Sequence, residues 1–211
     1  MTDEQKKKLR QSVQLDLLEV SGIPEIYWDE IVLDVRREDV DAYKRLNEIK
    51  QNIYDISEPR LDMKNLLICS SKTGNGKTSW AIKLLQFFIF KSAQHYPEEE
   101  NGFFVPTTEF VLASKEYDNS HRKKYWDMLT MIEKSRVVVF DDVGAGEYSR
   151  AEYMSLLSAI EGRVLRKQYC IFTSNFIEKD TAVVKRLGER LADRVFETSE
   201  KIILNGDGVR H

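Results

Sequence analysis

The chain has 211 residues, a length that fits one domain of ordinary to large size with a small appendage. Its 42% hydrophobic and 32% charged residues are typical of a folded protein and exclude an intrinsically disordered one. The formal net charge of −3 at pH 7 argues against coating of DNA through bulk charge, so any contact with nucleic acid must be local.

No run of residues approaches the ~18 consecutive apolar positions that a membrane span needs. The first residues, MTDEQKKKLRQ, lack the apolar core of a signal peptide, so we expect a cytoplasmic protein. Cys69 and Cys170 each lie in an apolar run and lack metal-ligand spacing, which predicts two core cysteines and no disulfide framework.

The N-terminal part of the chain is predicted to be helical. A helix is expected over 4–20, where a lysine-rich start precedes apolar residues at helical spacing, among them Leu9, Val13 and Leu17. The segment SGIPEIYW, residues 21–28, contains glycine and proline and interrupts the helix. A second helix is expected over 39–54, so residues 1–60 are assigned to a helical extension.

From residue 65 onward, short apolar runs alternate with longer helical patterns. The runs predict strands at 66–70, 103–105, 137–140, 170–173 and 201–204. Helices are expected between and after them, at about 76–94, 107–115, 121–134, 149–167 and 178–197. Continuous apolar strands separated by helices are typical of a parallel sheet covered on both faces. Residues 61–211 are therefore assigned to one α/β domain.

The segment SKTGNGKT, residues 71–78, resembles the phosphate-binding loop G-x-x-x-x-G-K-[ST], with Ser71 at the first glycine position. A predicted strand precedes it and a long apolar helix follows, which is the setting that such a loop requires. Lys77 is expected to bridge the β- and γ-phosphates of ATP, and the Thr78 hydroxyl to bind Mg²⁺. The predicted nucleotide contacts are Ser71, Thr73, Gly74, Asn75, Gly76, Lys77, Thr78 and Ser79.

The segment RVVVFDDVGAGE places two carboxylates at the end of a predicted buried strand, at the sheet edge where ligands bind. We expect Asp141 to hold Mg²⁺ and Asp142 to orient or deprotonate the attacking water. Two adjacent carboxylates repel each other, and a divalent cation relieves that repulsion. The next strand ends in CIFTSN, so Asn175 either lies near the γ-phosphate or caps the following helix.

The segment RLGERLADRVFE places Arg190 and Arg194 on one helical face. Arg194 is a candidate arginine finger for a neighbouring subunit, and the alternative is a solvated face paired with Glu189 and Asp193. Arg210, close to the end of the sequence, is a candidate phosphate contact.

Taken together, these motifs resemble the DnaC/DnaI-type helicase loaders of the AAA+ ATPases and the related IstB transposition ATPases. The resemblance rests on SGIPEIYW, SKTGNGKT, VVVFDDVGAGEYS, FTSNF and LGERLADR. It implies a five-stranded parallel sheet of order 5-1-4-3-2 with a minimal C-terminal lid. It also implies that Asn175 is sensor 1, Arg194 an arginine finger acting in trans, and Arg210 sensor 2.

Loaders of this type usually carry a larger N-terminal helicase-binding domain, sometimes with zinc. The short extension here resembles a compact phage or mobile-element version. The helix 4–20 is then the candidate helicase contact through Leu9, Val13 and Leu17, and the alternative is that it packs on its own core.

The segment SKEYDNSHRKKYW, residues 114–126, mixes cations with aromatic rings, as sequence-tolerant binding of single-stranded DNA requires. The resemblance points to Lys115, Tyr117 and Ser149 as DNA contacts, and composition adds Arg122, Lys123 and Lys124. The alternative is an ordinary helix start whose apolar side faces the core.

The function expected from the sequence is ATP-dependent loading of a DnaB-type replicative helicase onto single-stranded DNA. Weak ATP hydrolysis at subunit interfaces of a hexamer or open spiral would accompany it. Two alternatives stay open: an IstB-like ATPase that acts on duplex DNA, and a binding module that holds ATP without hydrolysing it.

Overall fold

The structure is a computed structural model that describes residues 15–29, 31, 33, 36–59, 62–95, 102–115 and 119–207. Residues 15–20 are helical, and two short 3₁₀ turns follow at η1 (Glu25–Tyr27) and η2 (Arg37–Asp39). Helix α2 (Val40–Ile56) completes the N-terminal part. Within the described part of the chain, no helix is both long enough and apolar enough to span a bilayer.

Five strands form one parallel sheet: β1 (Asn65–Cys69), β2 (Gly102–Pro106), β3 (Val137–Asp141), β4 (Tyr169–Ser174) and β5 (Ser199–Ile203). Their order is β2-β3-β4-β1-β5, which is the expected 5-1-4-3-2 read from the other edge. The predicted parallel α/β class and strand order are therefore confirmed.

The helices that follow the strands are α3 (Lys77–His95), α4 (Thr107–Ala113), α5 (Asn119–Lys134), α6 (Arg150–Leu165), α7 (Thr181–Leu187) and α8 (Glu189–Phe196). The single helix expected over 178–197 is wrong, because Gly188 divides it. Gly188 has φ 71° and ψ 152°, a conformation outside the helical region that glycine adopts without strain. A Cβ there would also lie 2.8 Å from the Tyr153 ring.

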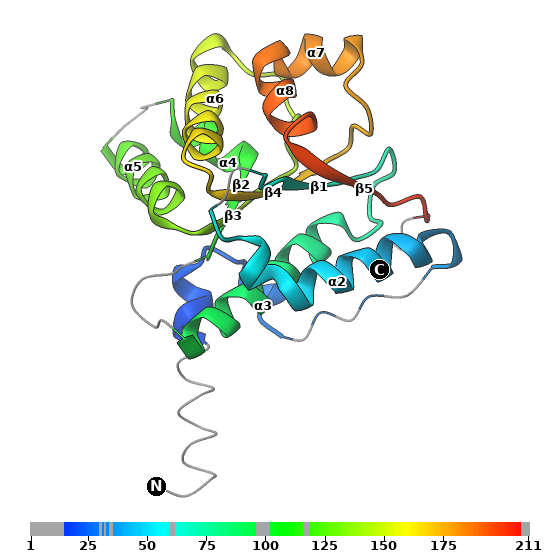
Figure 1. The fold of residues 1–211 in the computed structure, drawn as a ribbon. Coiled ribbons are helices and arrows are strands. Elements are labelled where there is room, and N and C mark those ends of the chain that lie inside the picture. The colour runs from blue at the N-terminus through cyan, green and yellow to red at the C-terminus, as the bar shows by residue number, and fades with distance from the viewer. Residues whose placement is uncertain are drawn as a thin grey trace, which may run out of the picture.

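Two hydrophobic cores lie on opposite faces of the sheet. Figure 1 shows α2 and α3 on one side, and α4 to α8 on the other. The strands supply both cores with alternate residues: Leu66 and Ile68 face α2 and α3, and Leu67 and Cys69 face the other helices. Burial on both faces explains why the inner strands β1, β3 and β4 are apolar at nearly every position, whereas the edge strand β5 begins with three polar residues.

The N-terminal part of the chain packs on the first of these cores. Four residues of α2 are buried there at helical spacing: Tyr43, Leu46, Ile49 and Ile53. The carbonyl of Ser21 accepts a 2.8 Å hydrogen bond from Phe104 N, so it pairs with the otherwise open edge of β2.

The short described part of the first helix contributes to the same core. Leu18 is buried and Leu17 is half-buried against the core, whereas Leu15 and Val20 are half-exposed. Leu9 and Val13 of the expected partner-binding set lie outside the described residues.

A fully buried arginine joins α5, α6 and β4. The guanidinium of Arg163 donates to the carbonyls of Ser135, Arg136 and Tyr169 at 2.8, 3.0 and 2.9 Å, and also to that of Ile132. These carbonyls lie at the C-terminal end of α5, in the following turn and at the start of β4. One side chain thus satisfies acceptors that would otherwise be buried without partners.

We predict that Arg163→Met lowers the free energy of unfolding by about 3 kcal/mol or more, since each buried acceptor left unsatisfied costs ~1–3 kcal/mol. Urea unfolding followed by circular dichroism measures the change. The control is Arg166→Met on the same helix turn, where an exposed guanidinium contacts Gln168. That change should stay within ~0.5 kcal/mol of the wild type; equal losses in the two variants would contradict the assigned role.

Candidate functional site

The strand order brings three chain segments to one edge of the sheet. Strand β4 lies between β1 and β3, with Cys69 opposite Ser174 and Phe140 opposite Phe172. All strands are parallel, so the segments that follow β1, β3 and β4 leave the sheet at the same edge. The phosphate loop, the two aspartates and Asn175 are therefore neighbours although they lie far apart in the sequence.

Asp141, at the end of β3, receives two hydroxyl groups from neighbouring elements. Its Oδ1 accepts hydrogen bonds from Thr78 Oγ1 on α3 at 2.9 Å and from Thr173 Oγ1 on β4 at 2.6 Å. Burial raises the pKa of the Asp141 carboxyl, and the hydroxyls of Thr173 and Thr78 oppose that rise. The side chain is thus fixed in place in a setting that disfavours its negative charge.

Asp142 is held by backbone and side-chain contacts in a left-handed conformation, with φ 56°. Its backbone N donates to Thr173 Oγ1 at 2.7 Å, and its Oδ1 accepts from Asn175 Nδ2 at 2.9 Å. A positive φ is uncommon for a residue other than glycine and marks a locally constrained turn.

The alternative assignment of Asn175 as a helix cap is wrong. The N-cap of α7 is Asp180, whose side chain accepts from Val183 N at 2.9 Å. Asn175 instead faces Asp142, the position expected of a residue that helps to place a water molecule.

The phosphate loop takes its turns at two glycines, Gly74 with φ 70° and Gly76 with φ 92°. The Lys77 ammonium donates to Lys72 O at 2.8 Å and to Asn75 Oδ1 at 3.3 Å. Burial lowers the pKa of the Lys77 ammonium, against the opposing effect of the nearby Asp142 and Asp141 carboxylates. Phosphate oxygens bound in the loop would offer this cation stronger acceptors than a backbone carbonyl.

Ser71 occupies the first glycine position of the loop pattern without backbone strain. Among the described residues, the only non-glycine residues with positive φ are Asp142 and Lys167. Ser71 is exposed and is not one of them, so the substitution does not by itself disturb the turn.

The residues at this edge fit a Mg²⁺ ion held together with a bound nucleotide. Thr78 and Asp141 present a hydroxyl and a carboxylate to one point, and both are ligand types that Mg²⁺ prefers. In the described ranges, no three His, Cys, Asp or Glu side chains gather as an all-protein metal site would need. Phosphate oxygens and water would supply the remaining ligands.

The sequence matches no protein-family model, and comparison with curated proteins also gives no match. Solved structures do match. The DnaC helicase loader aligns with a TM-score of 0.63 and 20% identity, over 86% of this chain and 99% of that one. For DnaI the TM-score is 0.59 and the identity 20%, over 82% and 87% of the two chains. The replication initiator DnaA, bound to AMPPCP and single-stranded DNA, aligns with a TM-score of 0.57 and 17% identity, over 82% of this chain and 48% of DnaA.

The chain has the AAA+ fold of the DnaC-type loaders. In this AAA+ fold, the loop after β1 and the ends of β3 and β4 form the candidate nucleotide site described above.

The two arginines of α8 share an anion that sequence reasoning did not identify. Arg190 Nη2 and Arg194 Nη2 lie 2.8 and 2.9 Å from the two carboxylate oxygens of Glu161 on α6. Hydrogen bonds from Arg194 and then Arg190 lower the pKa of Glu161. Asp193, the partner considered from the sequence, pairs instead with Lys179. Arg210 lies outside the described residues.

Most of the predicted DNA-binding side chains are engaged within the chain. Lys115 pairs with Glu152 at 2.8 Å and Lys123 with Asp127 at 2.8 Å, and Lys124 pairs with Glu109. Ser149 is the N-cap of α6, where its hydroxyl accepts from Glu152 N. Arg122 is exposed on α5, and Tyr117 lies outside the described residues.

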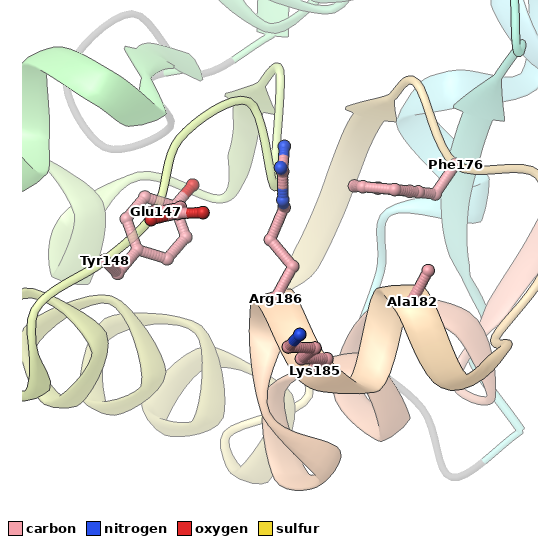
Figure 2. A pocket seen from close by; sticks show the side chains of 6 residues that line it. All are labelled: Glu147, Tyr148, Phe176, Ala182, Lys185 and Arg186. Atoms are coloured by element: carbon pink, nitrogen blue, oxygen red, sulfur yellow. The ribbon is translucent and has the colours of Figure 1, made fainter.

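A cavity of about 560 Å³ adjoins the loop that follows β3 (Figure 2), lined by Glu147, Tyr148, Phe176, Ala182, Lys185 and Arg186. Figure 2 shows Arg186 extending from α7 between the segments that carry Tyr148 and Phe176. Its guanidinium lies 5.9 Å from the centre of the Phe176 ring. The lining thus combines two cations, one carboxylate and two aromatic rings, with Arg186 over the Phe176 ring.

Two residues that contribute to the site went unassigned in the sequence analysis. Thr173 fixes both aspartates, and the only sequence signal is a polar residue at the end of an apolar strand. The Ser70 hydroxyl accepts hydrogen bonds from Lys72 N and from the buried Asn75 side chain, so it fixes the conformation of the loop.

We predict that Thr173→Val lowers the free energy of unfolding, by about 1–3 kcal/mol, because Asp141 loses a donor and Asp142 N an acceptor. The pKa of Asp141 is already raised in the folded state, and losing this hydroxyl raises it further. Well below the unfolded pKa of ~3.9, Asp141 is protonated in both states and its charge adds nothing. The loss should therefore grow as pH rises through the folded pKa, in urea titrations at several pH values.

The matched control is Thr107→Val, since the Thr107 hydroxyl is buried with no hydrogen-bond partner among the described residues. The free energy of unfolding of that variant should equal or exceed that of the wild type at every pH. A pH-independent loss in Thr173→Val would contradict the assigned link to Asp141.

Proposed function

We propose that the protein is an ATP-dependent loader that delivers a DnaB-type replicative helicase onto single-stranded DNA. The observation that carries the proposal is the set of hydrogen bonds joining Thr78, Asp141, Thr173, Asp142 and Asn175. These bonds bring a hydroxyl, two carboxylates and an amide together beside the predicted phosphate loop, which supports a role in ATP hydrolysis. The fold shared with the DnaC helicase loader and DnaI supports the choice of partner.

Each side chain has a distinct role in the proposed hydrolysis. Lys77 binds the β- and γ-phosphate oxygens, and the backbone amides of the loop bind the β-phosphate. Thr78 and Asp141 would hold Mg²⁺, which neutralises charge on the phosphates. Asp142 accepts a hydrogen bond from Asn175, and its other oxygen orients the attacking water and takes its proton.

Contact with single-stranded DNA forms the second part of the proposal. DnaA, of the same fold, is described as bound to single-stranded DNA. We assign the contact to Lys115, Tyr117, Arg122, Lys123, Lys124 and Ser149. The ion pairs of Lys123 and Lys124 are exposed, so phosphate groups can replace their carboxylate partners at little cost. Lys115 is paired with the largely buried Glu152, so its contact with DNA would require that ion pair to break.

A nucleotide titration tests the site itself. We expect Lys77→Ala to weaken ATP binding at least about tenfold, because the loop loses the cation that bridges the phosphates. Asp142→Asn should keep the affinity within about threefold of the wild type and lower hydrolysis at least ~100-fold, since it removes the base and leaves the loop intact. Calorimetry and phosphate release measure the two effects. Undetectable hydrolysis in the wild type, with DNA and helicase present, would favour a binding module.

The proposed arginine finger is tested by mixing variants. We expect Arg194→Ala and Lys77→Ala each to lose DNA-stimulated hydrolysis, and an equimolar mixture to recover part of it. The mixture contains interfaces that pair an intact Lys77 site with an intact Arg194 from the neighbour. Arg190→Ala is the matched control, because Arg190 shares the Glu161 contact. If the mixture recovers no DNA-stimulated hydrolysis, action in trans is contradicted. The same holds if Arg190→Ala loses as much hydrolysis as Arg194→Ala.

Copurification with a DnaB-type helicase tests the partner. We expect a complex that is lost when residues 1–20 are deleted, because the helix 4–20 is the proposed helicase contact. Circular dichroism of the truncated protein shows whether its fold is retained. Stable filaments on duplex DNA with no helicase complex would favour the IstB-like alternative.

A further inference from the structure

The residues that follow β5 lie between the phosphate loop and the N-terminal extension. We call residues 204–207 the C-terminal segment. Leu204 N donates to Cys69 O at 2.9 Å, which continues the pairing of β5 with β1 up to the start of the loop. From there the C-terminal segment is bound on two sides, by the loop and by residues before α2.

Three side-chain contacts join the C-terminal segment to the phosphate loop. Asn75 Nδ2 donates to Leu204 O at 3.1 Å, and Asn75 itself is fully buried. Lys72 Nζ donates to Asn205 O at 2.8 Å and lies 2.6 Å from Asp207 Oδ1. Both residues belong to the loop that is expected to enclose the phosphates, so the loop takes part of its shape from the C-terminal segment.

On the other side, a single buried carboxylate holds the backbone of the C-terminal segment. Asp39, which immediately precedes α2, is fully buried. Its Oδ1 accepts from Asn205 N at 2.6 Å, and both of its oxygens accept from Gly206 N, at 3.2 and 3.1 Å. Bonds from backbone N–H groups to an ionised carboxylate are stronger than those between neutral groups.

The contact at Gly206 leaves no room for a side chain. A Cβ at this position would lie 2.3 Å from Arg36 Cδ and 2.6 Å from Asp39 Oδ2. The extension also approaches the loop directly, since Leu33 Cδ2 would lie 3.5 Å from a Cβ at Gly76.

We infer that Asp39 is a positioning residue for the phosphate loop, acting through the C-terminal segment. The inference rests on the proposed function, in which the loop binds ATP. Asp39 accepts from Asn205 N and Gly206 N, whose peptide groups carry the Leu204 and Asn205 carbonyls. Those two carbonyls accept from Asn75 and Lys72, and the side chain of Asp207, the next residue, pairs with Lys72. The path therefore runs from the N-terminal extension to the phosphate site through directly bonded groups.

This arrangement couples the extension to the nucleotide. Any partner that alters the position of the segment around Asp39 will alter ATP affinity, and ATP will alter the partner's affinity by the same factor. The coupling follows because the loop and the extension bind opposite sides of the same four residues.

Calorimetric titration with ATP and Mg²⁺ provides the first test. We expect Asp39→Ala to weaken binding about tenfold, within the 5–150-fold range typical of coupled sites. Asp39→Asn keeps an oxygen acceptor and should stay within about threefold of the wild type. Gly206→Ala, which crowds the same contact without changing charge, should resemble Asp39→Ala. The control is Asp41→Ala, because Asp41 is an exposed acidic residue on the first turn of α2. This variant should bind ATP with the affinity of the wild type.

A double-mutant cycle separates positioning from general stability. In a Lys72→Met background, two of the three contacts between the loop and the C-terminal segment are absent. The effect of Asp39→Ala on ATP affinity should then shrink to about threefold or less. The inference would be overturned if Asp39→Ala weakened ATP binding by the same factor in both backgrounds. It would also be overturned if Asp39→Asn weakened ATP binding as much as Asp39→Ala does.

Hydrogen exchange without nucleotide keeps the inference separate from the proposed function. We expect amides of residues 71–76 and 205–206 to exchange faster in Asp39→Ala than in the wild type, with the core strands unchanged. Wild-type protein that does not bind ATP would overturn the proposed function, while this exchange result would still support the positioning of the loop. Unchanged exchange at 71–76 would overturn the positioning role even if ATP binds.

Discussion

The burial of one carboxylate at the end of β3 is the constraint on which the site depends. A carboxylate that loses water is tolerated only when hydrogen-bond donors replace it, and Asp141 has two hydroxyl donors from different elements. Thr78 comes from the helix after the phosphate loop, and Thr173 comes from the adjacent strand. Because Thr173 also accepts from Asp142 N, one set of bonds fixes the loop's helix, both aspartates and β4 relative to one another.

The charged groups of the site are arranged at a cost in stability. Burial raises the pKa of Asp141 and lowers that of Lys77, so both groups are driven toward their neutral forms. The proximity of Asp142 raises the Asp141 pKa further. A bound triphosphate with a divalent cation would reverse this balance, since the phosphates stabilise the ammonium and the cation stabilises the carboxylates. An arrangement that is unfavourable alone and favourable with a ligand is typical of functional sites.

The sequence was sufficient to predict the parallel sheet and the glycine-containing turn between β1 and α3, because both depend on local patterns. An apolar run indicates a strand that is buried on both faces of the sheet. The glycines of the loop pattern indicate a turn with positive φ, which few other residues adopt. The break at Gly188 was missed because the flanking residues keep helical spacing, and the deciding contact is the distant Tyr153 ring. Glu161 and Asp39 were missed for the same reason: their partners lie 29 to 167 positions away. No local pattern encodes such pairs.

The double pairing of Glu161 bears on how the proposed assembly could form. An arginine that leaves an intramolecular carboxylate to reach a neighbour's phosphates would ordinarily strand a partly buried negative charge. Here Arg190 contacts both oxygens of Glu161, at 3.0 and 2.8 Å. It would therefore keep that carboxylate neutralised after Arg194 departs. Two arginines on one acid thus lower the cost of releasing the one that the proposed mechanism needs, and the i, i+4 repulsion between them favours that release.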